Sequence, residues 1–157
     1  RKALDKKEKE IYTRDCGMKI DLLNLNWIYR AKKYYHMLPP DIYLMTIPIH
    51  YRIKVDEFKA LVEAPTVDQF IQLLANTYYE NRFHAMQRSE GMEQFYKACI
   101  HGMYLSDRRR NPYSLATVNT YLFLKEEEIN RLTTALECIR YGLTPRETLG
   151  YIGGAKK

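Results

Sequence analysis

The longest periodic pattern in the chain lies near its C-terminus, in the stretch SLATVNTYLFLKEEEINRLTTALECIRYG, residues 114–142. Positions spaced alternately three and four apart form one face of a helix, and all but one of them are apolar. These positions are Leu115, Val118, Leu122, Lys125, Ile129, Leu132, Leu136 and Ile139. The pattern predicts a long helix with an apolar seam. We expect it to end at Gly142, because glycine readily adopts the left-handed conformation of a helix cap.

Lys125 is the only charged residue in this seam, and three glutamates follow it directly. One interpretation is that the lysine packs its aliphatic chain along the seam and keeps its ammonium group in water. The other is a partly buried ion pair with Glu128 or with Asp21 of the first long helix. A polar residue at one seam position lowers stability but can fix register and partner choice. We predict that Lys125 lies within salt-bridge reach of a carboxylate and is mostly buried.

The remaining segments also have helical periodicity, and no stretch alternates as a strand would, so the sequence predicts an all-α fold. The expected helices span about 7–36, 42–46, 54–64, 65–79, 89–110 and 144–152. Ser89 is the expected cap of the fifth helix. For the last helix we expect Thr144 as the cap, Pro145 in the first turn and Glu147 reaching back to the cap. The predicted seam of the first helix includes Ile20, Leu23, Trp27, Tyr34 and Met37, with the cation Arg30 among them.

The sequence also contains a short internal repeat. The stretch LPPDIYLMTI (38–47) aligns with LTPRETLGYI (143–152), and each follows a long helix. One helical unit used twice would explain the repeat. We therefore expect two related units, at about 1–50 and 112–152, which flank a middle helical segment at about 52–108.

Composition narrows the class of protein. The chain has 157 residues, enough for one compact domain or two small lobes, and a formal net charge of +6. Its basic residues are mostly interleaved with acidic ones, so dense runs such as DRRR (107–110) are expected to be solvated faces. Three cysteines without paired spacing suggest a reducing compartment rather than a disulfide framework. No apolar run is long enough to predict a membrane-spanning helix.

No arrangement in the sequence indicates catalysis. Cys99 and His101 are one residue apart, which points them to different faces of a helix, so we expect no metal site. The consecutive glutamates 126–128 fan out around their helix, and Glu127 is placed to pair with Arg131 four residues on. Phosphate-binding glycine loops and nucleophile elbows are absent from the sequence. We predict no catalytic residue, no cofactor and no metal.

Three segments, in order along the chain, resemble a known family. The stretch KIDLLNLNWIYRAKKYY resembles a D-x-x-N-[LI]-x-x-[IL]-x-R-x-K signature, with matches at Asp21, Asn24, Leu25, Ile28, Arg30 and Lys32. A middle segment is similar to L-x-x-A…L-x-x-T-x-Y, carried by Leu61, Ala64, Leu74, Thr77 and Tyr79. The closing segment is similar to Y-[LI]-x-x-K-E-x-E-I-x-x-[LI], carried by Tyr121, Leu122, Lys125, Glu126, Glu128, Ile129 and Leu132.

The family that these segments resemble is the C-subunit family of archaeal and bacterial A/V-type ATPases, whose member in the eukaryotic vacuolar enzyme is the d-subunit. The resemblance covers only the C-terminal half of longer members, so we expect this chain to be part of a longer protein. It implies an all-α body of repeated three-helix units without catalytic activity. It also implies a peripheral subunit on the cytoplasmic face of the membrane, which joins the central shaft of the ATP-hydrolysing head to the membrane rotor ring. Proton or sodium ion transport by the complex would follow.

The competing hypothesis is a helical nucleic-acid-binding or general protein-interaction module. Arg108, Arg109 and Arg110 are its best candidates, but they precede Pro112 at the end of a predicted helix. We expect no nucleic-acid partner and no direct membrane span. The sequence leaves open whether the chain pairs with a second copy to cover exposed seams.

Overall fold

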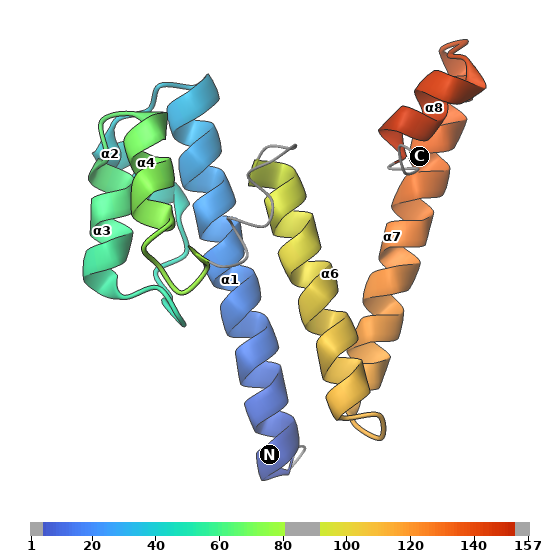
Figure 1. The fold of residues 1–157 in the computed structure, drawn as a ribbon, viewed down its shortest axis with the longest axis horizontal. Coiled ribbons are helices and arrows are strands. Elements are labelled where there is room, and N and C mark those ends of the chain that lie inside the picture. The colour runs from blue at the N-terminus through green and yellow to red at the C-terminus, as the bar shows by residue number, and fades with distance from the viewer. Residues whose placement is uncertain (1–4, 81–91, 153–157) are drawn as a thin grey trace. The chain divides into compact units, whose positions relative to one another are not determined.

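The computed structural model describes residues 5–80 and 92–152, and in these stretches it contains seven helices and no strand. The fold class is therefore the predicted one. The chain forms two compact units, Arg1–Ser106 and Asp107–Lys157. The first contains α1 (Lys6–Tyr34), α2 (Pro39–Met45), α3 (Val55–Glu63), α4 (Val67–Leu74) and most of α6 (Met92–Arg110); α7 (Leu115–Arg140) and α8 (Pro145–Tyr151) lie in the second (Figure 1).

In the first unit, α2, α3 and α4 pack beside the C-terminal half of α1 (Figure 1). Isolated helices as short as α3 and α4 are marginal in water, so they depend on this packing. The core is built from fully buried aliphatic and aromatic side chains, each contributing about 1.5–3 kcal/mol through burial. Its members include Leu25, Ile28, Ile42, Leu61, Val62, Phe70 and Leu74, all at 0% exposure.

The buried face of α1 is not the seam that the sequence predicts. Ile20, Leu23 and Trp27 are only half-buried, and Tyr34 is 60% exposed. The buried face instead runs through Met18, Leu22, Leu25 and Ile28, and it also includes two polar residues, Asp21 and Asn24. Because polar residues interrupt the true apolar face, periodicity favours the more continuous apolar series next to it. Arg30 belongs to that series and is exposed.

The first helix ends two residues earlier than predicted, at Tyr34. His36 has a left-handed backbone with φ of 48°, and the Met37 N–H donates to the Ala31 carbonyl at 3.1 Å. The chain is then extended at Leu38, which the following proline favours. Proline is compatible with the first turn of a helix, so α2 begins at Pro39, three residues before the predicted start.

The second unit shows the predicted helix ends. Gly142 has φ of 72°, its N–H donates to the Ile139 carbonyl and the Leu143 N–H donates to the Cys138 carbonyl, each at 3.0 Å. This is the two-bond closure that glycine permits at a helix C-terminus. The capping box of Thr144 and Glu147 is also present, with Pro145 in the first turn of α8. The Ser89 cap lies outside the described residues.

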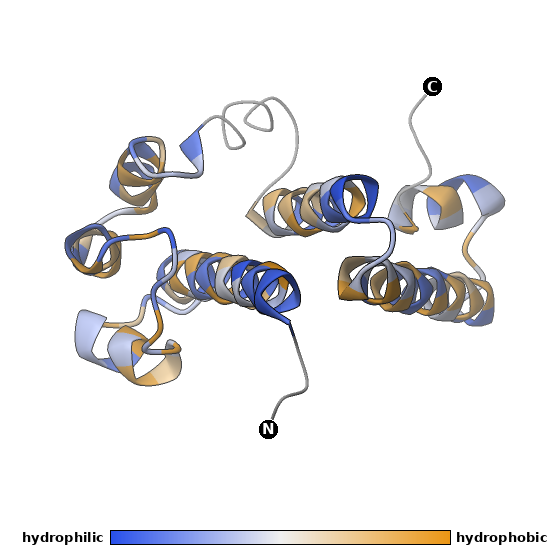
Figure 2. Ribbon diagram, turned by 90° about the horizontal axis from the view of Figure 1, so that it is seen from below, coloured by the Kyte–Doolittle hydropathy of each residue, from blue (hydrophilic) through white to orange (hydrophobic). Residues whose placement is uncertain are grey.

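Each of the two longest helices is followed by a seven-residue helix with proline in its first turn, α2 after α1 and α8 after α7. This arrangement agrees with the short internal repeat in the sequence. The division into two related units around a middle segment stays a prediction. Hydrophobic positions recur along the helices of both units (Figure 2).

Replacing Gly142 with alanine should destabilise α7 by about 1 kcal/mol, because alanine disfavours a positive φ. Gly150→Ala is the matched control. Neither position has a neighbour within 4 Å of an added Cβ, and Gly150 lies inside helix α8. Urea denaturation followed by circular dichroism should therefore show a loss of stability for Gly142→Ala only. Equal effects of the two substitutions would contradict the backbone explanation.

The pKa of the Glu147 carboxyl is expected below its ordinary value of 4.5, because the hydroxyl and the backbone N–H of Thr144 both donate to it. A depressed carboxyl pKa stabilises the folded state above the ordinary value, and this contribution is lost as pH falls through the depressed one. NMR titration of the side-chain carboxyl should show the low pKa in the native chain. Thr144→Ala should move it back toward 4.5, and an unchanged titration curve would contradict the capping box.

Candidate functional site

Asp21 is a buried polar side chain with several hydrogen-bond partners in the first unit. It is 1% exposed, and its oxygens accept hydrogen bonds from three consecutive backbone N–H groups of the loop between α2 and α3. The donor–acceptor distances are 3.0 Å for Tyr51, 2.7 Å for Arg52 and 3.3 Å for Ile53. A buried carboxylate is tolerated only when such bonds replace its water. Asp21 therefore fixes the path of this loop against α1.

Asn24 lies one turn further along α1 and secures the start of the same loop. Its side-chain Nδ2 donates to the Ile47 carbonyl, and its Oδ1 accepts from the Ile47 N–H, both at 2.9 Å. The pair reproduces the hydrogen bonding of a β-bridge in a segment that has no secondary structure of its own. Because Asn24 is 1% exposed, an unpaired amide here would destabilise the fold.

Lys32 binds the end of α3. Its Nζ donates to the carbonyls of Val62 and Ala64, each at 2.6 Å. The carbonyls at a helix C-terminus lack partners within the helix and carry partial negative charge, so they favour a cation. Burial lowers the pKa of the Lys32 ammonium group.

Thr77 and Tyr79 connect the segment after α4 to the hydrogen bonds of Asp21. The Thr77 hydroxyl donates to the Leu74 carbonyl at 2.8 Å and accepts from the Tyr79 N–H at 3.3 Å. Tyr79 is fully buried, and its hydroxyl donates to Asp21 Oδ2 at 3.2 Å. Two motif segments that are 58 residues apart in sequence are thus joined by one hydrogen bond. We call Asp21, Asn24, Lys32, Thr77 and Tyr79 the α1 clamp.

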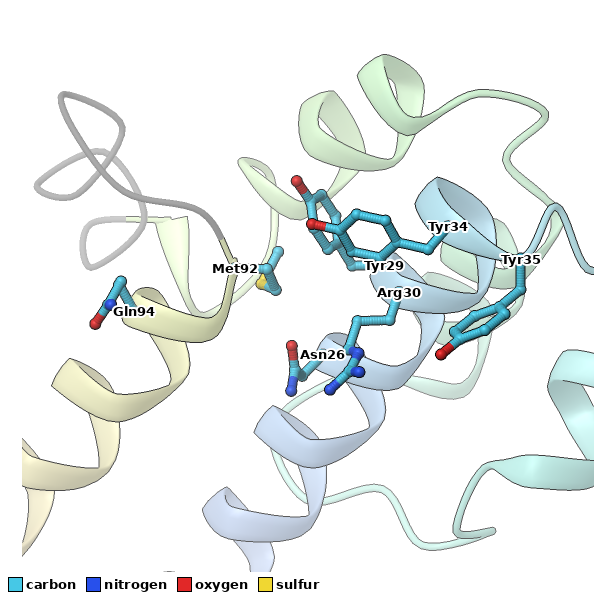
Figure 3. A pocket seen from close by; sticks show the side chains of 7 residues that line it. All are labelled: Asn26, Tyr29, Arg30, Tyr34, Tyr35, Met92 and Gln94. Atoms are coloured by element: carbon cyan, nitrogen blue, oxygen red, sulfur yellow. The ribbon is translucent and has the colours of Figure 1, made fainter. Parts of the chain in front are cut away.

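The clamp residues of α1 share one helix face. Asp21 and Lys32 are eleven residues apart, or about three turns, whereas Arg30 is nine residues from Asp21, or about two and a half turns. Arg30 therefore projects from the opposite face, where it is exposed. It lines a pocket of about 580 Å³ together with Asn26 and tyrosines of α1 and with Met92 and Gln94 of α6 (Figure 3).

The motif residues of the second unit lie on an exposed surface. The Lys125 Nζ is 2.6 Å from Glu128 Oε2, which confirms the predicted ion pair, and this carboxylate raises the pKa of the lysine. The predicted burial is wrong, because the two side chains are 50% and 55% exposed. Tyr121 and Ile129 are also exposed. Asp21, the alternative partner, bonds instead with backbone groups and Tyr79.

The exposure of Lys125 follows from that of the whole seam. The seven apolar seam residues of α7 range from 36% exposed at Leu115 to 68% exposed at Leu136 and Ile139. Within its unit, α7 packs against α8 near its C-terminal end (Figure 1). The buried residues of α7 are Ala116, Thr120 and Cys138, which lie outside this seam. Periodicity shows which residues share a helix face, but not which face another element covers. The predicted pair of Glu127 and Arg131 is present at 3.8 Å.

Gly17 is a structural requirement that the sequence analysis did not single out. A Cβ added at this buried position would lie 2.4 Å from Cγ of Tyr51, a distance that real side chains do not reach. The glycine therefore lets the ring of Tyr51 pack directly on the backbone of α1. A glycine inside a helical pattern is the signal that could have marked this close approach.

The described residues contain no group of three or more side chains suited to hold a metal ion. None of the helices in residues 5–80 and 92–152 is both long and apolar enough to cross a membrane. Arg108, Arg109 and Arg110 are exposed at the end of α6, as expected for a solvated charge run. The expectation is wrong for Asp107 of the same run, which is 3% exposed. Cys16, Cys99 and Cys138 are not joined in disulfides.

Tyr79→Phe should destabilise the chain by about 1–2 kcal/mol, because it removes a buried hydroxyl that donates to a carboxylate. Tyr78→Phe is the matched control at the neighbouring residue, whose side chain is 52% exposed, and should change stability by less than about 0.5 kcal/mol. Urea denaturation of both variants checks this.

A double-mutant cycle with Asp21→Asn then isolates the bond between the two clamp residues. If they interact as described, the effects of Asp21→Asn and Tyr79→Phe should fall short of additivity by at least about 0.5 kcal/mol. Strict additivity, or an equal loss in Tyr78→Phe, would contradict the clamp.

Comparison with models of protein families gives a match. The family model for the ATP synthase (C/AC39) subunit matches residues 1–151, almost the entire chain. No curated protein and no solved structure matches the chain significantly. The match agrees with the resemblance of the three motif segments. The first two segments supply the residues of the α1 clamp, and the third forms the exposed stretch of α7. The chain belongs to the ATP synthase (C/AC39) subunit family of V/A-type ATPases.

Proposed function

We propose that the chain is part of a non-catalytic central-stalk subunit of a rotary A/V-type ATPase. In this role it couples the ATP-hydrolysing head and its shaft to the membrane rotor ring, and so to proton or sodium ion transport. The observation that carries the proposal is the family match over residues 1–151. The partners are then the shaft subunits and the ring, and the location is the cytoplasmic face of the membrane.

The α1 clamp supports a mechanical role. A coupling must pass torque between partners without bending, which requires elements held at several points. The 29 residues of α1 span about 44 Å, and the clamp ties this helix to the α2–α3 loop, to the end of α3 and to the segment after α4. Displacing any of these segments would break hydrogen bonds to buried polar groups, so α1, α2, α3 and α4 should move as one body.

The hydrogen bonds of the motif residues also support a subunit that is not catalytic. Asp21, Asn24 and Thr77 direct their polar atoms to backbone groups, and Tyr79 donates to Asp21. A carboxylate that acts as a general acid or base must reach a substrate. Asp21 is 1% exposed and already accepts four hydrogen bonds, which is the environment of a structural carboxylate.

Ion pumping by the complete ATPase tests the proposal. Membranes from cells that lack the full-length protein should hydrolyse ATP with little or no ion uptake, because the head turns without driving the ring. Adding back the full-length protein should restore uptake and raise the number of ions moved per ATP. The protein should also copurify with the shaft subunits.

Two results would contradict this function. One is ion uptake that stays normal in the absence of the protein. The other is a full-length protein that folds but does not join the complex. A control addition of heat-denatured protein should leave uptake unchanged, which separates specific coupling from a general effect of added protein on the membranes.

A further inference from the structure

The pocket on the outer face of α1 contains a cation that has no partner in the described residues. Arg30 is exposed, and no carboxylate of these residues pairs with it. Its neighbours differ, since Lys32 binds two backbone carbonyls and Lys33 donates to the Tyr29 hydroxyl at 2.9 Å. The end of α1 thus concentrates positive charge, and Arg30 is the cation left to bind an outside group.

A second feature of the pocket is a buried acceptor. The side-chain Oδ1 of Asn26 is buried and has no hydrogen-bond partner in the described residues. Asn26 and Arg30 are four residues apart on α1, so they neighbour each other on one helix face (Figure 3). A buried acceptor without a donor destabilises the protein until a ligand or water supplies one. The pocket therefore combines an exposed anion-binding guanidinium with a buried acceptor, which a neighbouring side chain must uncover before an outside N–H group can reach it.

The walls of the pocket are aromatic. Tyr34 and Tyr35 are 60% and 65% exposed. Burying these rings against a partner would be favourable, because most of a tyrosine ring is apolar. Lys33 lies over the rings of Tyr29 and Tyr34, with its Nζ 5.2 and 5.3 Å from their centroids, which holds these rings in place. Arginine and tyrosine in a partly closed pocket are the residues that dominate the binding energy of protein interfaces.

We propose that this pocket docks an acidic segment of a partner protein. A Glu or Asp side chain of the segment pairs with Arg30, and a main-chain N–H next to it donates to Asn26 Oδ1. Tyr34 and Tyr35 pack against the stem of the acidic side chain. Charge complementarity selects the partner, since the guanidinium fork fits a carboxylate in two hydrogen bonds. The inference does not depend on the proposed function.

NMR with a defined acidic peptide tests the docking site. The probe is acetyl-hexaglutamate amide, added to the ¹⁵N-labelled 157-residue chain at about 0.15 M salt, where charges more than about 8 Å apart are largely screened. We expect the side-chain N–H signals of Arg30 and Asn26 to shift together. Acetyl-hexaglutamine amide, which keeps the main-chain N–H groups but has no carboxylates, should bind at least tenfold more weakly.

Matched variants separate the site from general attraction. Arg30→Gln should weaken peptide binding at least tenfold, and Asn26→Ala should weaken it several-fold. Lys19→Gln removes the same charge from an exposed position on the same side of α1, about three turns away, and should leave binding within twofold. Because Arg30 and Lys19 are both exposed, neither substitution should unfold the chain, which circular dichroism will verify.

Three results would overturn the proposal. The first is equal weakening by Arg30→Gln and Lys19→Gln, which would show unspecific attraction between charges. The second is glutarate binding as tightly as the peptide, which would show a site for free small anions. The third is the absence of any shift at Arg30 and Asn26 with millimolar peptide.

Discussion

The first unit depends on one buried carboxylate. Asp21 accepts hydrogen bonds from the backbone of residues 51–53 and from the hydroxyl of Tyr79, and so joins α1 to two segments that have no regular structure. Loops normally lie at the surface because their backbone groups need water. Here a side chain replaces the water, which lets the α2–α3 loop pass over the core. The short helices α3 and α4 then have a fixed place on α1.

The same helix performs different tasks on its two faces. The inner face carries Asp21, Asn24 and Lys32 and satisfies backbone groups of the neighbouring segments. The outer face carries Arg30 and Asn26, whose polar atoms lack partners in the described residues. A coupling subunit needs both properties, because it must be rigid inside and must present specific contacts outside. The proposed role and the proposed docking site therefore place different demands on one element.

Local rules predicted much of this fold. The left-handed cap at Gly142 and the capping box of Thr144 and Glu147 depend only on neighbouring residues, and both are present. The ion pair of Lys125 and Glu128 follows from one helical turn. Long-range features could not be read in the same way. The exposure of the α7 seam depends on which element covers it, and the sequence of a helix does not contain that information.

The clamp shows where periodicity fails for a physical reason. The buried face of α1 contains Asp21 and Asn24, so apolar spacing favours the series of Ile20, Leu23 and Trp27 beside it. Both polar residues were found through the family resemblance, which could identify them but not give their partners. Their hydrogen bonds span from 23 to 58 residues, and only the folded chain brings these groups together.

Native-state hydrogen exchange tests the central claim most directly. The N–H groups of Tyr51, Arg52 and Ile53 lie outside any helix, and in this account Asp21 alone protects them. They should exchange as slowly as the buried amides of α1 near Leu25, and Asp21→Asn should speed their exchange while the amides of α7 are unaffected. Exchange at the rate of an unprotected peptide in the native chain would contradict the account.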